Sequence, residues 1–282
     1  MTMKRIATIQ DVSCLGKCSL TVALPVISAF GVETCIVPTA VLSTHTMFKN
    51  YTFRDLTSDL EPIKEHWKRE GFSFDALYSG YLGSDEQLSI VKDYFTEFKT
   101  ENNIILIDPV MADNGKLYPG FTPEFAKKMA KLCGVADIIV PNLTEASYMT
   151  GEKYVESGYS EEYIRNMLQK LVALGAKTAV LTGVSFDEGK IGVYGYDNVK
   201  GEYFSYFNER VPASYHGTGD IFSSAVLGGL MRGYSLLKSL RIAADFTAEC
   251  IRVTLNDKNS VDYGVEFELV LPELIKEIEI NG

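Results

Sequence analysis

Short apolar runs alternate with amphipathic stretches along all 282 residues, and this alternation restricts the fold more than any other feature of the sequence. Apolar runs of about four to eight residues between turn-forming residues are typical of buried strands, and apolar residues spaced three or four apart are typical of helices. Strands that alternate with helices form parallel sheets, because each helix carries the chain back to the same edge. The pattern therefore predicts an α/β fold in three layers, with a mostly parallel central sheet and helices on both faces.

The individual elements follow from the same pattern. Strands are predicted at Ile6–Gln10, Glu33–Val37, Ala76–Ser79, Ile104–Ile107, Ile138–Val140 and Thr178–Thr182. Helices are predicted at Cys18–Phe30, Leu60–Glu70, Asp85–Lys99, Pro123–Leu132, Leu143–Thr150, Glu161–Leu174, Asp220–Arg232, Leu236–Leu255 and Glu266–Glu279. Two further runs, Ile191–Tyr196 and Glu202–Asn208, predict a small antiparallel hairpin at the sheet edge. Because no linker, repeat or low-complexity stretch interrupts the chain, we expect a single domain over residues 1–282.

The composition excludes several classes of protein. The net charge is −10 and no basic run exceeds a pair of cations, so we expect no nucleic-acid partner and no anionic membrane surface. No apolar run approaches the ~20 residues that cross a bilayer. The five cysteines are odd in number and include no Cys-x-x-Cys pair, a usage typical of reduced thiols in the cytoplasm. We therefore expect a cytoplasmic protein without disulfides.

Polar residues stand where the predicted strands end. Asp11 follows the first strand, Tyr81 the third, Asp108 the fourth and Asn142 the fifth, and Thr182 ends the sixth. In open parallel sheets the ligand crevice lies beyond the carboxyl ends of the strands. The placement therefore predicts that these side chains share one active cleft.

The stretch Ser214–Asp220 and the small, apolar run after it are the strongest candidate for chemistry. Gly217 and Gly219 permit a tight turn, and the backbone N–H groups at the start of the following helix form a site for an anion. Asp220 lies where the loop becomes helix. Amides that hold developing negative charge, beside a carboxylate that accepts a hydroxyl proton, suit phosphoryl transfer. The alternative is a glycine turn in which Asp220 only caps the helix.

Other polar motifs allow two interpretations each. Asp108 precedes Pro109, so it either displays a carboxylate for Mg²⁺ or only forms a turn. Asn142 and Glu145 have the spacing of a capping box, yet their oxygens also suit a hydrated Mg²⁺. His45 is one of three histidines and is either structural or catalytic.

Two familiar nucleotide motifs are absent. Gly16-Lys17 is followed by Cys18 in place of Ser or Thr, so the chain has no Walker A loop there. The first predicted strand is not followed by Gly-x-Gly-x-x-Gly, which argues against a dinucleotide-dependent dehydrogenase.

With these residues in place, nearly the whole chain resembles the ribokinase-like superfamily, and within it the pyridoxal/pyridoxamine (vitamin B6) kinases. The order and spacing of five motifs carry the resemblance: Ser43-Thr44-His45-Thr46, Ser79-Gly80-Tyr81-Leu82-Gly83, Asp108-Pro109-Val110-Met111, Pro141-Asn142-Leu143-Thr144-Glu145 and Gly217-Thr218-Gly219-Asp220. The resemblance implies a ribokinase-like sandwich that uses ATP and Mg²⁺ to phosphorylate the 5′-hydroxymethyl group of a B6 vitamer, usually as a homodimer.

The resemblance also implies roles for single residues. Asp220 would be the base, and the amides of Gly217, Thr218 and Gly219 would stabilise the transferring phosphoryl group. Asp108 and Glu145 would position Mg²⁺ and the ATP phosphates. The remaining implied positions are, for the vitamer, Asp11, His45, Thr46 and Tyr81 and, for ATP, Asn142, Thr182, Arg210, Val211 and Ala213.

Some residues depart from the B6 kinase pattern. Many B6 kinases carry Ser or Thr at the position of Asp11, so the preferred vitamer is left open. The motif His216-Gly217-Thr218-Gly219 is also similar to hydroxymethylpyrimidine kinases of thiamin metabolism, which often have Cys at the position of Asp220. That activity and a sugar kinase of the same superfamily are the alternatives, and a non-catalytic ligand-binding protein is a third. A role for K⁺, the dimer interface and the lid (Met47–Phe53 or Asp113–Gly120) are left open too.

Overall fold

The computed structural model describes residues 3–280, which form two compact units. Unit 1 combines residues 3–76 with residues 211–280, and unit 2 is the continuous stretch 77–210. The expectation of a single kinase domain stays a prediction. Among the described residues, no helix is both long and apolar enough to cross a membrane.

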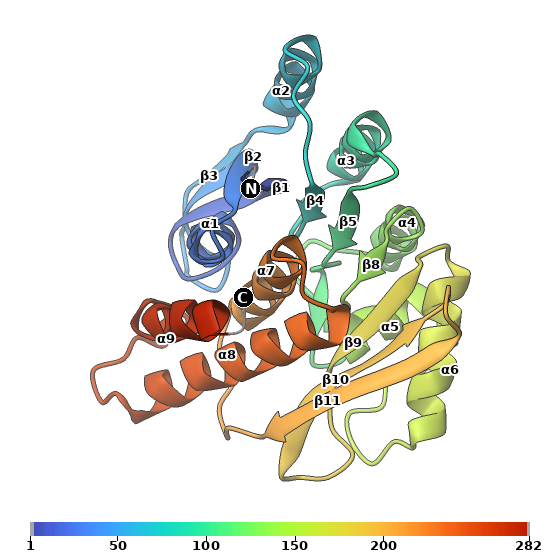
Figure 1. Cartoon of the computed structure of the whole chain (residues 1–282), viewed down its shortest axis with the longest axis vertical. Coiled ribbons are helices and arrows are strands. Elements are labelled where there is room, and N and C mark those ends of the chain that lie inside the picture. Colours follow the sequence, from blue (N-terminus) through green and yellow to red (C-terminus); the bar gives the residue numbers. More distant parts are fainter. Residues whose placement is uncertain (1–2, 281–282) are drawn as a thin grey trace. The chain divides into compact units, whose positions relative to one another are not determined.

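Unit 1 is built from two distant parts of the chain, which Figure 1 colours blue and orange to red. Its N-terminal part contains β1 (Arg5–Leu15), α1 (Leu20–Ala29), β2 (Glu33–Thr44), β3 (Phe53–Asp55) and α2 (Thr57–Arg69). Its C-terminal part contains α7 (Thr218–Met231), α8 (Leu236–Asn256) and α9 (Phe267–Ile280). β1 pairs with β2 in parallel, and β2 pairs with β3 in antiparallel fashion.

The first strand is longer than its sequence pattern predicts. The prediction that β1 ends at Gln10 is wrong, because the strand continues to Leu15 and holds Asp11 within it. The register against β2 shifts between Gln10 and Val12. Irregularities of this kind re-aim a side chain, and they concentrate near active sites. Asp11 is therefore presented by a break in the ladder and not by a strand end.

Small residues let α7 pack closely in the core of unit 1. A side chain added at Gly228 would meet the Phe30 ring 2.4 Å from its Cβ, and one added at Gly229 would meet Ser239 Oγ of α8 at 2.7 Å. α7 also packs against α1. Because ten residues of α7 are buried, including Asp220, the helix is held firmly on several sides.

Unit 2 contains the remaining elements. They are β4 (Ala76–Ser79, at the unit boundary), α3 (Asp85–Phe98), β5 (Ile104–Ile107), β6 (Ala112–Asp113), β7 (Lys116–Leu117), α4 (Pro123–Cys133), β8 (Ile138–Ile139), α5 (Leu143–Thr150), α6 (Glu161–Ala173), β9 (Thr178–Val184), β10 (Lys190–Asp197) and β11 (Glu202–Glu209). The strand order is β11-β10-β9-β8-β5-β4. β5, β8 and β9 are parallel, whereas β10 and β11 form the predicted antiparallel hairpin.

Each predicted helix and strand is present, but the prediction that β2 ends at Val37 is wrong because the strand continues to Thr44, and three short strands were not predicted. β3, β6 and β7 contain only two or three residues each, too few for a periodic pattern to show. β9 extends to Val184, so the prediction that Thr182 ends its strand is wrong. By contrast, Asp108 directly follows β5 and Tyr81 follows β4, as predicted.

Candidate active site

The first turn of α7 carries the predicted base in unit 1. Gly217 precedes the helix with φ 80° and ψ 0°, a left-handed conformation that favours glycine. Asp220 lies three residues later, and only 9% of its surface is exposed. The Thr218 hydroxyl donates a hydrogen bond to the Tyr215 carbonyl (3.2 Å), and Gly219 is exposed. The glycine turn, the helix start and the buried acid thus occur together as predicted.

A second buried acid of unit 1, Asp11, is bonded to two serine hydroxyls. Ser19 Oγ donates to Asp11 Oδ1 (2.5 Å), and Ser13 Oγ donates to Asp11 Oδ2 (3.0 Å). The Ser19 amide donates to Asp220 Oδ2 (2.9 Å). Burial raises the pKa of Asp11, and the two hydroxyl donors oppose that rise. Burial and the nearby carboxylates of Asp220 and Asp11 raise the pKa of the Cys18 thiol to about 12, so this cysteine is a neutral thiol.

The His45 ring is held by hydrogen bonds at both of its nitrogens. The Met47 amide donates to His45 Nδ1 (3.3 Å), so the ring proton is on Nε2, which donates to the Tyr263 carbonyl (2.9 Å). The His45 ring lies edge-on to His216, with 4.8 Å between centroids, and 4.9 Å from Phe48. Burial, with His45 as a further cause, lowers the pKa of His216 to about 4. These contacts of His45 connect the segments that precede β3, α7 and α9.

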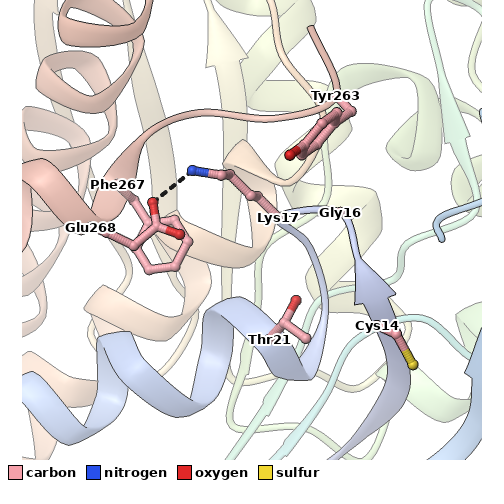
Figure 2. A pocket seen from close by; sticks show the side chains of 7 residues that line it. All are labelled: Cys14, Gly16, Lys17, Thr21, Tyr263, Phe267 and Glu268. Carbon is pink, nitrogen blue, oxygen red and sulfur yellow. Dashed lines mark hydrogen bonds and ion pairs between the residues drawn. The ribbon is translucent and has the colours of Figure 1, made fainter. Parts of the chain in front are cut away.

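A polar cavity of about 210 Å³ lies beside His45 and Tyr263 in unit 1. Its wall combines residues from the end of β1 to the first turn of α1 with residues before and at the start of α9: Cys14, Gly16, Lys17, Thr21, Tyr263, Phe267 and Glu268. Figure 2 shows the Lys17 ammonium directed at the Glu268 carboxylate, 2.7 Å away, with the Phe267 ring beside it. Lys17, the one cation in the wall, is therefore already paired with Glu268.

Unit 2 brings the two predicted metal-binding acids together. Asp108 follows β5 and is 5% exposed, and Glu145 in the first turn of α5 is 3% exposed. Glu145 Oε1 accepts from the Met111 amide (3.2 Å), and Oε2 accepts from the Asn142 amide (2.9 Å). Burial and the adjacent Asp108 charge raise the pKa of Glu145 well above its usual value. Two buried acids that repel each other form a site that a cation would stabilise.

Asn142 and Thr182 complete this cluster in unit 2. Asn142 caps α5 by accepting from the Glu145 amide (2.9 Å), so the predicted capping box is present. Its side-chain amide donates to the Ala112 carbonyl (2.8 Å). Asn142 also forms a parallel bridge with Thr182, whose amide donates to the Pro141 carbonyl (3.0 Å). The capping interpretation and the ligand interpretation of Asn142 are thus compatible.

The other predicted residues lie in less enclosed positions. Thr46 is exposed beside His45, and Tyr81 is half-buried in unit 2, where its ring lies 5.6 Å from that of Phe121. The three remaining nucleotide positions occur where the chain passes from unit 2 to unit 1: Arg210, Val211 and Ala213. Arg210 is exposed and donates from its amide to the Gly189 carbonyl (2.9 Å).

The predicted residues therefore form one cluster in each unit. Unit 1 unites Asp11 with Asp220, and unit 2 unites Asp108 with Glu145, Asn142 and Thr182. That all of them share one cleft stays a prediction. Residues 3–280 contain no group of three or more His, Cys, Asp or Glu placed to hold a metal ion, so a metal here would depend on few protein ligands.

Sequence reasoning missed the residues that support these acids. Ser19 falls inside the predicted helix Cys18–Phe30, although a serine just before an apolar helical run is itself a helix-start signal. Ser13 lies only two residues from Asp11, but that spacing alone carries no specific signal, whereas His216 and Tyr263 contact His45 from distant parts of the sequence. The structure alone connects Ser19 to an acid 201 residues away.

Comparison with protein families finds a match over most of the chain. Residues 22–264 match the family model described as phosphomethylpyrimidine kinase. A hydroxymethylpyrimidine/phosphomethylpyrimidine kinase from Aquifex aeolicus is 29% identical over 249 residues, which cover 86% of this chain and 89% of that protein.

Two solved structures extend the comparison. A Bacteroides thetaiotaomicron protein assigned to the phosphomethylpyrimidine kinases is 38% identical, with a TM-score of 0.93 over 97% of this chain and 94% of that one. Another crystal form of it contains pyridoxal. Pyridoxal kinase from Lactobacillus plantarum is 30% identical, with a TM-score of 0.89 over 99% of both chains. The predicted fold class, a mostly parallel sheet with helices on both faces and an antiparallel hairpin, is confirmed by this likeness.

Proposed function

The chain belongs to the phosphomethylpyrimidine kinase family, and on this premise we propose that it phosphorylates the 5′-hydroxymethyl group of a B6 vitamer with ATP. The observation that carries the proposal is the start of α7, where a left-handed glycine, the N-terminus of the helix and the buried Asp220 occur together. The likeness to a pyridoxal kinase, and to a structure that contains pyridoxal, supports the choice of substrate.

Asp220 is proposed as the base that orients the alcohol and takes its proton. The amides of Gly217, Thr218 and Gly219 belong to the N-terminus of a 14-residue helix, where the helix dipole favours negative charge. They are proposed to stabilise the phosphoryl group as charge develops on its oxygens. Phosphoryl transfer depends on positioning and charge stabilisation more than on covalent chemistry, and this arrangement offers both.

Asp108 and Glu145 are proposed to hold Mg²⁺ with the ATP phosphates. The fit follows from their chemistry: both are buried, and the repulsion that raises the pKa of Glu145 would be relieved by a cation. Mg²⁺ keeps several waters and takes only one or two carboxylates beside phosphate, so a pair of acids is sufficient. The ion would neutralise phosphate charge.

The vitamer is proposed to bind through Asp11, His45, Thr46 and Tyr81. The His45 ring, fixed by its bonds to the Met47 amide and the Tyr263 carbonyl, is proposed to contact the ring of the vitamer. Asp11 offers carboxylate oxygens, which suit the protonated ring nitrogen or the amine of a vitamer. ATP is proposed to contact Asn142, Thr182, Arg210, Val211 and Ala213. A cytoplasmic homodimer, with or without K⁺, stays a prediction.

A hydroxymethylpyrimidine kinase is the second candidate function. The family model and the Aquifex aeolicus relative favour it directly. Both candidates transfer phosphate to a hydroxymethyl group on a flat nitrogen heterocycle, so the chemistry proposed for Asp220 applies to either. They differ in the ring that the pocket recognises.

One experiment separates the candidates. The purified protein is assayed with ATP and Mg²⁺ against pyridoxal, pyridoxamine, pyridoxine and hydroxymethylpyrimidine, with ADP release and the phosphorylated product both measured. We expect the highest kcat/KM for a B6 vitamer. A higher kcat/KM for hydroxymethylpyrimidine would replace our proposal with the second candidate.

The role of Asp220 is tested in the same assay. Asp220→Asn should lower kcat by about 10²–10⁴-fold, the usual contribution of a general base. Asp93→Asn on the exposed face of α3 makes the same chemical change far from any predicted role and should leave kcat unaltered. Near-normal turnover by Asp220→Asn would refute the assignment.

A further inference from the structure

Ser19 is bonded to both buried acids of unit 1 at once. Its amide donates to Asp220 Oδ2 (2.9 Å), and its hydroxyl donates to Asp11 Oδ1 (2.5 Å). Only 5% of Ser19 is exposed, so water does not compete strongly for either bond. Hydrogen bonds to ionised acceptors are the stronger kind. One residue therefore fixes an oxygen of each carboxylate.

The backbone of Ser19 is in a conformation that serine rarely adopts. Its φ is 51° and its ψ is −136°, a region that glycine occupies far more readily. Such strain persists only where surrounding contacts hold it, and it concentrates at functional sites. The contacts are present here. The Ser19 carbonyl accepts the Val22 and Ala23 amides at the start of α1, and the preceding Lys17 carbonyl lies against Gly217.

We propose that Ser19 is a positioning residue for phosphoryl transfer, whose amide orients the base Asp220 and whose hydroxyl orients Asp11 toward the vitamer. The inference rests on the proposed function, since it gives the two acids the roles assigned above. In this assignment Ser19 contacts neither the alcohol nor the transferring phosphoryl group. Because one residue holds both carboxylates, Asp11, which binds the substrate, and Asp220, which takes the proton of the alcohol, keep a fixed orientation relative to each other.

Two substitutions separate the two bonds. Ser19→Gly removes the hydroxyl but tolerates the positive φ, so the amide stays on Asp220. Ser19→Ala also removes the hydroxyl, but its side chain disfavours this φ, and without the bond to Asp11 the peptide relaxes and draws the amide away from Asp220. Both variants should therefore raise KM for the alcohol about tenfold, as expected for losing a hydrogen bond to a charged group. Only Ser19→Ala should also lower kcat, by about tenfold.

Ser13→Ala is the matched control. Ser13 donates to the other oxygen of Asp11 but makes no bond to Asp220. Its loss should raise KM for the alcohol and leave kcat within about twofold of wild type. KM for ATP should stay within about twofold in all three variants. Thermal unfolding of each variant establishes that it is folded at the assay temperature.

The outcomes are distinct. Equal loss of kcat in Ser19→Gly and Ser19→Ala, or an unchanged KM for the alcohol in both, would overturn the positioning role. A purely structural role would lower the unfolding temperature without this split between KM and kcat. All measurements use the alcohol that the wild-type protein phosphorylates best. A wrong substrate assignment therefore appears in the wild type, before any variant is compared, and is not confused with a failure of Ser19.

Discussion

The close contact between Gly217 and the Lys17 carbonyl gives a quantitative prediction. A Cβ added at Gly217 would lie 1.8 Å from Lys17 O and 2.9 Å from Lys17 C. Real Cβ atoms do not approach backbone so closely, and a carbonyl cannot swing away as a side chain can. Gly217→Ala must therefore displace the Lys17 peptide, at a cost of about 1–3 kcal/mol for overpacking. The positive φ of Gly217 adds about 1–2 kcal/mol.

Gly233 provides the matched control for the conformational part of this cost. It follows the other end of α7 with φ +83°, close to the +80° of Gly217, and nothing lies within 4 Å of its Cβ position. Gly233→Ala should therefore incur the φ cost alone. The difference in unfolding free energy between the two variants should be about 1–3 kcal/mol, from the clash.

Urea and thermal unfolding measure this difference. For a chain of this size, about 1 kcal/mol corresponds to roughly 2–4 °C, so Gly217→Ala should unfold roughly 2–12 °C below Gly233→Ala. Kinase turnover should fall with it, because the displaced peptide belongs to the segment that leads to Ser19. Equal stability of the two variants would refute the packing argument.

Four further predictions concern charged and titratable groups. Burial lowers the pKa of His216 to about 4, so between pH 6.5 and 4 the unfolded chain is protonated at this ring and the folded chain is not. The wild type therefore loses stability as pH falls through this range, and His216→Gln should remove that loss. Urea midpoints measured across pH test this. Glu145→Gln should remove a pH dependence of the opposite sign. Burial and Asp108 raise the pKa of Glu145, so the wild type loses stability as pH rises above the usual 4.5 and the variant should not. Asp108→Asn should raise the Mg²⁺ concentration for half-maximal turnover by about 10–100-fold, measured by titration at saturating ATP. Glu268→Gln should change the unfolding free energy by less than about 1 kcal/mol, because its ion pair with Lys17 has a half-exposed carboxylate.

Much of the fold could be predicted from local sequence signals. Ser84 accepts from the Gln87 amide at the start of α3, and α5 has the predicted bounds Leu143–Thr150, because caps are set by a few neighbouring residues. The antiparallel hairpin is confirmed with its ends shifted by one residue. The resemblance to the ribokinase-like superfamily and the B6 kinases is likewise confirmed by the comparisons.

The rest depends on contacts between distant residues. Asp11 lies inside a strand and not after it, because the register shift that presents it arises from pairing with β2. The conformation of Ser19 has no local signal: its φ is held by bonds that include one to an acid 201 residues away. The candidate acids could be named from the sequence, but the residues that orient them could not.

The division of unit 1 between the two ends of the chain affects its synthesis on the ribosome. α1 packs against α7, yet Thr218 is added about 190 residues after Ala29, roughly 10–40 s later at ~5–20 residues per second. During that interval the nascent N-terminal part exposes the apolar face that α7 later covers. The growing chain therefore carries an exposed apolar surface, of the kind that chaperones bind, until α7 emerges, and Asp220 joins unit 1 only then.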